Sequence, residues 1–404
     1  MEHCSLTIAQ NRTDYFRKGI LLNLQYWQVW VGKKISDVPA LDQERANVIR
    51  AIAYALDMEE AWPSVYELIM TFSLYMEKRG YWDNWNQILR RAAKAAEQNN
   101  DTGKGINLSV LLARLLFQQS RFKEAVICYR QTLHLTRQLG DRFNEGRICS
   151  NLGYYYIERG QWYRAEALCC HALSLFEQIN SAHGRAHTEN HLGILYTWQQ
   201  RWDQAQKHLE QACKLWSSMQ DEYGLMRGYI NLGGLYNWIK YPDKSMFYLE
   251  KALHQAQLTG AETDMGTIYM NMGVSYRLAG DFSMAENYAK QAEIIFQHFS
   301  NTTGLAQVWD NMGVLYFKQG KLQKANQYLE RSLNMWRTLN NRKGEIRTLM
   351  EMIEFELATG NLLQAQILLK KVEQLIGQNR MMQYQDLQER FIYYHQQLGE
   401  HSTA

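Results

Sequence analysis

Small, apolar and aromatic residues recur along this chain at a fixed spacing of 40 positions. Five strings, NLGYYY, HLGILY, NLGGLY, NMGVSY and NMGVLY, begin at residues 151, 191, 231, 271 and 311. A second series runs in step with them, in which Gly160, Gly280 and Gly320 are followed two positions later by an apolar residue and then by a small one. Self-similarity with a period of 20 to 50 residues is typical of stacked repeat architectures. The pattern therefore predicts a repeat protein.

Each 40-residue unit predicts two helices. A glycine such as Gly160 permits the left-handed conformation that ends a first helix, and the apolar residue after it starts the second. Gly153 and its equivalents lie inside the first helix, where glycine costs about 1 kcal/mol relative to alanine. We therefore expect a neighbouring helix to press against the backbone at these glycines. The tyrosine three residues later, such as Tyr156, is expected to fill the gap between repeats.

These strings resemble the tetratricopeptide repeat in its longer form of about 40 residues, as in kinesin light chains and many bacterial signalling proteins. The resemblance implies an all-α fold, a right-handed α-solenoid of antiparallel helix pairs. We expect eight pairs over 61–379, an N-terminal helical cap over 1–60, and a C-terminal capping helix and tail over 380–404. The end units depart from the pattern, as capping units do. With only three prolines in 404 residues, little interrupts these helices.

The segment that begins LDQERANVIRAIAYALDMEEAW is similar to the helical region that precedes such repeats in signal-transducing ATPases with numerous domains, the STAND class. The resemblance implies that the chain is a sensor arm. The glycine cluster Gly103-Lys104-Gly105 lacks the spacing and the hydroxyl residue of a phosphate-binding loop.

The resemblance further implies that the first helix of each pair lines a concave groove that binds a peptide or a partner domain. The groove positions that follow from it are Asn151, His191, Asn231, Asn271, Asn311, Arg147, His187, Arg227, Arg277, Trp198 and Trp238. In the family, the asparagine commonly bonds the backbone of an extended peptide. The arginines favour an acidic ligand, because guanidinium groups pair with carboxylates.

An ordinary structural role is open for each of these groups. The asparagines can tie neighbouring helices together, since buried amides are usually satisfied internally. The arginines can pair with nearby acids such as Glu158, Glu189 or Asp310. The two tryptophans can simply pack between helices.

Composition narrows the class of partner. The 44 basic residues nearly balance the 41 acidic ones, which argues against nucleic acid. No stretch of about 18 apolar residues occurs, so no membrane insertion is expected. The six cysteines fit no zinc or disulfide pattern, and the N-terminal sequence has no signal-peptide features. Together these features predict a reduced, cytoplasmic protein.

His183, His187 and His191 recur every four residues and so share one face of a helix. Such pairs can bind zinc or nickel, but no carboxylate is assured nearby, and Arg147 and Arg227 would oppose a dication. We therefore expect no metal and no cofactor, and instead a pH-tuned carboxylate site.

No catalytic motif is present in the sequence, so the chain is not expected to be an enzyme. The sequence predicts an interaction scaffold or adaptor that binds a protein or extended peptide, with an acidic ligand favoured. A regulatory sensor arm, working with a separate STAND-type ATPase or transcriptional regulator, is the alternative. The ligand's identity and the oligomeric state do not follow from the sequence.

Overall fold

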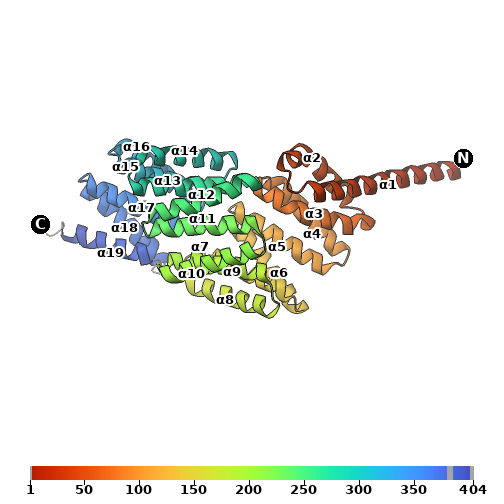
Figure 1. Ribbon diagram of the computed structural model, residues 1–404, viewed down its shortest axis with the longest axis horizontal. Coiled ribbons are helices and arrows are strands. Elements are labelled where there is room, and N and C mark those ends of the chain that lie inside the picture. Colours follow the sequence, from red (N-terminus) through yellow and green to blue (C-terminus); the bar gives the residue numbers. More distant parts are fainter. Residues whose placement is uncertain (1, 380–384, 401–404) are drawn as a thin grey trace. The chain divides into compact units, whose positions relative to one another are not determined.

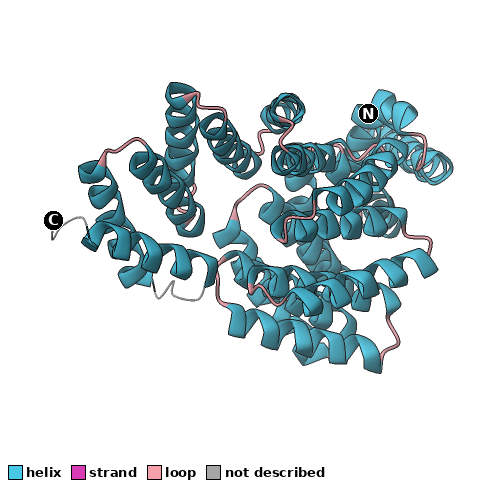
Figure 2. Cartoon of the chain, turned by 60° about the vertical axis from the view of Figure 1, so that its left-hand side comes forward, coloured by secondary structure: helices cyan, strands magenta, loops and turns pink. Residues whose placement is uncertain are grey.

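The computed structural model describes residues 2–379 and 385–400, and every element in those ranges is helical (Figures 1 and 2). The chain forms two compact units, Met1–Asn144 and Glu145–Ala404. No helix in the described ranges is long and apolar enough to cross a membrane. The expected divisions near residues 60 and 380 stay predictions, and residues 380–384 and 401–404 of the expected C-terminal cap lie outside the described residues.

Over its described residues, unit 1 consists of six α-helices and one short 3-10 helix. They are α1 (Glu2–Lys34), α2 (Val38–Ala55), η1 (Glu59–Ala61), α3 (Trp62–Lys78), α4 (Trp82–Gln98), α5 (Thr102–Gln118) and α6 (Phe122–Leu139). One hydrophobic core runs through this unit, from Leu24 on α1 to Ala125 on α6.

Unit 2 contains the strongest repeats, and its first helix begins just before the unit boundary. Its helices are α7 (Arg142–Glu158), α8 (Trp162–Gln178), α9 (Ala182–Trp198), α10 (Trp202–Ser218), α11 (Glu222–Trp238), α12 (Pro242–Thr259), α13 (Glu262–Ala279), α14 (Phe282–His298), α15 (Thr302–Lys318), α16 (Leu322–Thr338), α17 (Arg342–Ala358), α18 (Leu362–Asn379) and α19 (Gln385–Glu400). The helix pairs follow the 40-residue register, as the sequence predicts.

Each first helix ends in the left-handed conformation that the second sequence series predicts. Gly160, Gly280 and Gly320 have φ of 65°, 87° and 73°, and the same position is left-handed at Gln200 and Lys240, with φ of 55° and 61°. The next first helix is then capped by a polar side chain that accepts a backbone N–H bond. These caps are Asp101, Ser181, Asp221, Asn301 and Asn341.

The glycines inside the first helices are required by close packing. A Cβ atom on Gly273 would lie 3.2 Å from the backbone oxygen of Ala285 and 3.4 Å from the backbone nitrogen of Ala289. The expected close helix is therefore confirmed, but it is α14, the second helix of the same pair. The tyrosines stack within their own pair, as Tyr276 does on Tyr288 at 5.4 Å. They also reach the preceding repeat, as expected, because the hydroxyls of Tyr196 and Tyr316 donate to Glu166 at 2.9 Å and to Glu286 at 3.0 Å.

Candidate groove surface on the first helices of unit 2

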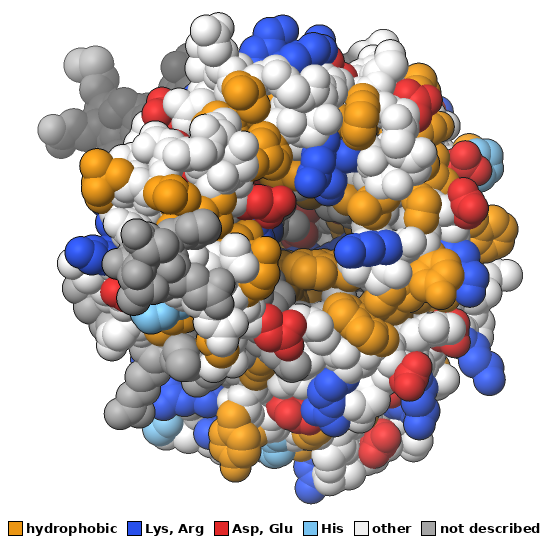
Figure 3. All heavy atoms as spheres, turned by 90° about the vertical axis from the view of Figure 1, so that its left-hand side faces the viewer, with side chains coloured by type: hydrophobic (Ala, Val, Ile, Leu, Met, Phe, Trp, Pro, Cys, Tyr) orange, Lys and Arg blue, Asp and Glu red, His pale blue; other side chains and the backbone are white. Residues whose placement is uncertain are grey.

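The first helices of successive pairs contact one another in unit 2. Contacts join α9 to α11, α11 to α13, α13 to α15 and α15 to α17, so residues 40 positions apart follow one another along the same surface. We call the part of this surface that carries the expected ligand-binding residues the first-helix face. The face of unit 2 seen in Figure 3 is hollowed near its centre, with charged and hydrophobic side chains around the hollow.

Two arginines on the first-helix face are half-buried and form no ion pair with any residue in the described ranges. They are Arg227 on α11 and Arg277 on α13. Burial lowers the pKa of the Arg277 guanidinium, while the charge of Glu351 acts in the opposite direction. Arg277 and Asn311 also line a cavity of about 10 Å³ between α13 and α15. Arg147, also expected on this face, is half-buried on α7.

A third arginine, Arg347, pairs with a nearby acid of the protein, which is the structural alternative considered for these arginines. Arg347 Nε donates to Asp310 Oδ2 at 3.1 Å, and Thr348 donates to the other carboxylate oxygen at 2.7 Å. Burial raises the pKa of Asp310, although the Arg347 charge acts to lower it. Of the acids considered as partners in the sequence, Glu189 instead pairs with His208. Pairing with an internal acid therefore accounts for Arg347, whereas Arg227 and Arg277 have no such partner among the described residues.

The four asparagines expected on the first-helix face, which we call the asparagine ladder, also differ in whether they have an internal partner. Asn231 Nδ2 donates to Asn190 Oδ1 at 2.8 Å, which ties α11 to α9. The side-chain amides of the other ladder members, Asn151, Asn271 and Asn311, are half-buried and form no hydrogen bond to another described residue. Asn271 contributes only its backbone oxygen, which accepts from Asn237 Nδ2 at 2.9 Å. The structural role holds for Asn231, and a ligand-binding role for the other three stays a prediction.

His191 is a core residue, which corrects its expected protonation near neutral pH. Its side chain is 6% exposed, its Nδ1 is hydrogen-bonded to Ser150 Oγ at 2.9 Å, and its ring stacks on Tyr154 at 5.1 Å. Burial, and next the charge of Arg227, lower the pKa of His191 to about 3. His191 therefore stays neutral over the physiological range. His187 is half-buried and packs edge to face against Trp216 at 5.3 Å.

The two expected tryptophans contact each other, with ring centroids 5.4 Å apart in an edge-to-face arrangement. Lys343 Nζ, from α17, lies 3.2 Å from the centroid of the Trp198 ring. This contact occupies one face of Trp198, which favours the packing alternative for that residue. Trp238 is 39% exposed and remains accessible to a ligand.

A buried polar network between repeats was missed by the sequence reasoning. Asn237 on α11 accepts a hydrogen bond at 2.8 Å from Ser275 Oγ on α13, and Ser245 Oγ lies 2.9 Å from the same serine oxygen. Ser245 and Ser275 are fully buried. The sequence contains one indication of this network, which is Ser245 at a position where most repeats have alanine. A buried hydroxyl group requires a hydrogen-bond partner inside the stack.

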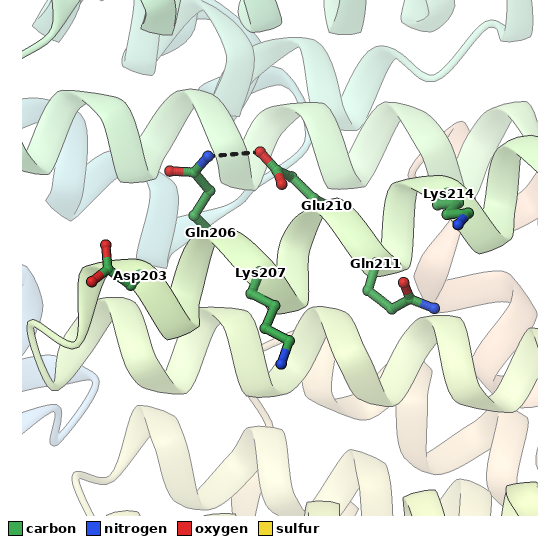
Figure 4. Close-up of a pocket in the computed structure, with 6 residues that line it drawn as sticks. All are labelled: Asp203, Gln206, Lys207, Glu210, Gln211 and Lys214. Atoms are coloured by element: carbon green, nitrogen blue, oxygen red, sulfur yellow. Dashed lines mark hydrogen bonds between the residues drawn. The ribbon is translucent and has the colours of Figure 1, made fainter.

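A separate hollow of about 460 Å³ lies along the second helix α10 (Figure 4). Its lining residues are Asp203, Gln206, Lys207, Glu210, Gln211 and Lys214. Acidic and basic side chains alternate there, and Gln206 Nε2 donates to Glu210 Oε1 at 2.8 Å. Because its charges balance and it lies on a second helix, this surface is a useful reference for the first-helix face.

Two groups of side chains in the described ranges have donor atoms close enough together to hold a metal ion. One consists of Glu145, Cys149 and His171, and the other of His183, His187 and Asp221.

Family models described as tetratricopeptide repeat match residues 108–143, 144–218 and 264–338. No curated protein matches the sequence.

Several solved structures are similar to the chain. A Rap protein complexed with competence and sporulation factor is 16% identical and has a TM-score of 0.57, over 87% of this chain and 99% of that chain. NprR in complex with its cognate peptide NprX is 17% identical and has a TM-score of 0.52, over 72% of this chain and 82% of that chain. At these identities the likeness shows the shared fold.

A STAND protein with a tetratricopeptide-repeat sensor, from Pyrococcus horikoshii, is 15% identical, with a TM-score of 0.49 over 85% of this chain and 55% of that chain. This degree of similarity does not assign a function to the chain. Cooperation with a separate ATPase or transcriptional regulator therefore stays a prediction.

Proposed function

Because the chain belongs to the tetratricopeptide-repeat family, we propose that the first-helix face of unit 2 binds an extended, acidic segment of a partner protein. One observation carries the proposal: Arg227 and Arg277 are half-buried cations without an ion pair among the described residues. Removing a cation from water costs free energy unless an anion accompanies it. Carboxylates of a ligand supply that anion and bond to guanidinium groups in a two-pronged geometry.

The neighbouring amides suit the backbone of the same ligand. Asn271 and Asn311 each offer a side-chain donor and acceptor that no described residue occupies. A peptide in an extended conformation presents N–H and C=O groups at regular intervals. The two asparagines therefore hold the ligand backbone, while the arginines recognise its acidic side chains. Trp238, exposed beside Trp198, accepts an apolar side chain.

The similar structures support a peptide as the ligand class. The Rap protein is complexed with competence and sporulation factor, and NprR is in complex with its cognate peptide. Their folds match this chain over 87% and 72% of its length. The acidic character proposed here comes from Arg227 and Arg277 of this chain alone.

A selection experiment tests the proposal. The full chain selects binders from a display library of random peptides of about ten residues, and hydrogen exchange then maps where a selected peptide protects the backbone. We expect selected peptides enriched in aspartate and glutamate, and new protection on α11, α13 and α15. Selected peptides without acidic enrichment, or protection confined to second helices such as α10, would contradict the proposal.

A further inference from the structure

Two histidines on one helix and an aspartate from the next repeat converge at the N-terminal end of α9. His183 and His187 are four residues apart, and their ring centroids lie 4.6 Å from each other. Asp221 is the residue that caps α11, and its Oδ2 lies 3.6 Å from His183 Nε2. All three donor atoms lie within 4.8 Å of one another. Helices α9 and α11 lie side by side in unit 2 (Figure 1).

Neighbouring groups orient two of these side chains. Asp221 Oδ1 accepts the backbone N–H of Gly224 at 2.9 Å, so the capping bond fixes the carboxylate and turns Oδ2 toward His183. The His187 ring packs edge to face against the buried Trp216. Such supporting contacts are what hold metal ligands in place. The His183 side chain is 60% exposed, which gives an ion a direct path from solvent.

The donor set matches a borderline metal ion. Zinc binds imidazole nitrogen and carboxylate oxygen at about 2.0–2.2 Å, and a tetrahedral site with three protein ligands keeps a fourth position open. The donor atoms lie within 4.8 Å of one another, so side-chain rotations of this small group are needed to bring them to that geometry. The carboxylate also answers the objection raised from the sequence, where no acid was assured near the histidines.

The charged surroundings weaken the site without abolishing it. Arg227 occupies the register position of His187 one repeat later, and its charge acts on His191, one turn along α9. The Asp221 carboxylate supplies the opposite charge at the ion itself. The other group, Glu145, Cys149 and His171, is less accessible, because the Cys149 side chain is fully buried between helices.

We propose that His183, His187 and Asp221 bind a divalent transition-metal ion, with Zn²⁺ as the best match, and that the ion ties α9 to α11. The site links two consecutive repeats, so its occupancy stabilises their mutual arrangement in unit 2. This inference does not depend on the proposed peptide-binding function, because its ligands are distinct from Arg227 and Arg277.

Calorimetric titration of ZnCl₂ into the untagged full chain tests the site. We expect one tight equivalent in the unaltered protein, and affinity about tenfold or more weaker in His183→Ala/His187→Ala and in Asp221→Asn. Asparagine keeps the helix cap, as Asn301 and Asn341 do for their own helices, so Asp221→Asn separates metal binding from folding. Zinc should also raise the melting temperature of the unaltered protein and not of the variants.

Three results would overturn the inference: no zinc binding by the unaltered protein, equal binding by all three proteins, or loss of binding in His171→Gln instead, which would assign the ion to the other group. Arg227→Ala/Arg277→Ala should bind zinc at least as tightly as the unaltered protein, because the Arg227 charge opposes the ion. A failure of the peptide-binding proposal therefore leaves the zinc result interpretable, and the reverse also holds.

Discussion

Lys343 Nζ lies 3.2 Å from the centroid of the Trp198 ring, which joins α17 to α9 across three intervening repeats of unit 2. Trp162 on α8 likewise packs against the hydrophobic cluster formed by α16 to α19. The helices of unit 2 therefore curve until distant repeats touch. This contact limits how far the first-helix face can open, so it bears directly on access for a ligand.

The Lys343–Trp198 contact should contribute measurably to stability. Lys343 is 9% exposed, and a desolvated cation over an indole ring contributes about 2 kcal/mol. A double-mutant cycle with Lys343→Met and Trp198→Leu, measured by urea unfolding, should give a coupling energy of about 1–2 kcal/mol. Additive effects of the two substitutions would show that the contact contributes nothing.

The glycines of the first helices should respond to substitution according to their surroundings. At Gly273 an added side chain meets the backbone of α14, so Gly273→Leu should destabilise the protein by about 1–3 kcal/mol or more. Gly234, on α11, is the matched control, because a Cβ there meets nothing within 4 Å. Gly234→Ala should stabilise by up to about 1 kcal/mol, since alanine is the better helix former. Equal melting-temperature changes in both variants would argue against the packing explanation.

His191 should make the folded protein less stable in acid. Its folded pKa is about 3, below the value of about 6.5 expected in the unfolded chain. As the pH falls below 6.5 the unfolded chain takes up a proton that the folded protein refuses, so stability is lost progressively down to about pH 3.

Asparagine, the residue at the same register position in four other repeats, removes this titration and keeps a hydrogen-bond acceptor for Ser150. Between pH 7 and pH 5 the unaltered protein should lose about 2 kcal/mol more unfolding free energy than His191→Asn. Parallel pH dependence of the two proteins in urea unfolding would contradict the buried, neutral state of His191.

Asn231 should be a stability residue, in contrast to Asn271. Asn231→Ala leaves the buried Asn190 Oδ1 without its donor, which costs about 1–3 kcal/mol. Asn271→Ala removes an amide with no described hydrogen-bond partner and should change stability by less than about 0.5 kcal/mol. The comparison is made by thermal unfolding without any ligand. Equal destabilisation by the two variants would show that the ladder acts as one structural unit.

The sequence predicted the helices well because local rules determine them. The positions of Gly160 and Gly280 mark helix ends through backbone geometry, and the Asp281 side chain directly after Gly280 caps the next helix. The close helix contact at the glycines inside the first helices was also correctly expected. Which helix presses on these glycines could not be predicted, because a 40-residue period does not say which of two neighbouring helices lies closer.

The candidate site was only partly predictable. Arg227 and Arg347 occupy the same register position, yet Arg347 pairs with Asp310 and Arg227 has no described ion-pair partner. His191 and Asn231 also share a register position, but a serine pairs with one and an asparagine with the other. These differences depend on residues about 40 positions away, so a pattern read along one helix does not reveal them.

The proposed ligand chemistry is tested most directly by comparing two variants that remove the same charge from different surfaces. The affinity of a selected acidic peptide is measured for the unaltered protein, for Arg227→Ala/Arg277→Ala, and for Lys207→Ala/Lys214→Ala on α10, at 150 mM salt. All three proteins must first show the same helical content and melting temperature. We expect the arginine variant to bind at least about 30-fold more weakly, equivalent to about 2 kcal/mol, and the lysine variant to bind within about twofold of the unaltered protein. Unchanged affinity in the arginine variant, or an equal loss in both, would contradict the assignment of Arg227 and Arg277 as the acid-binding residues.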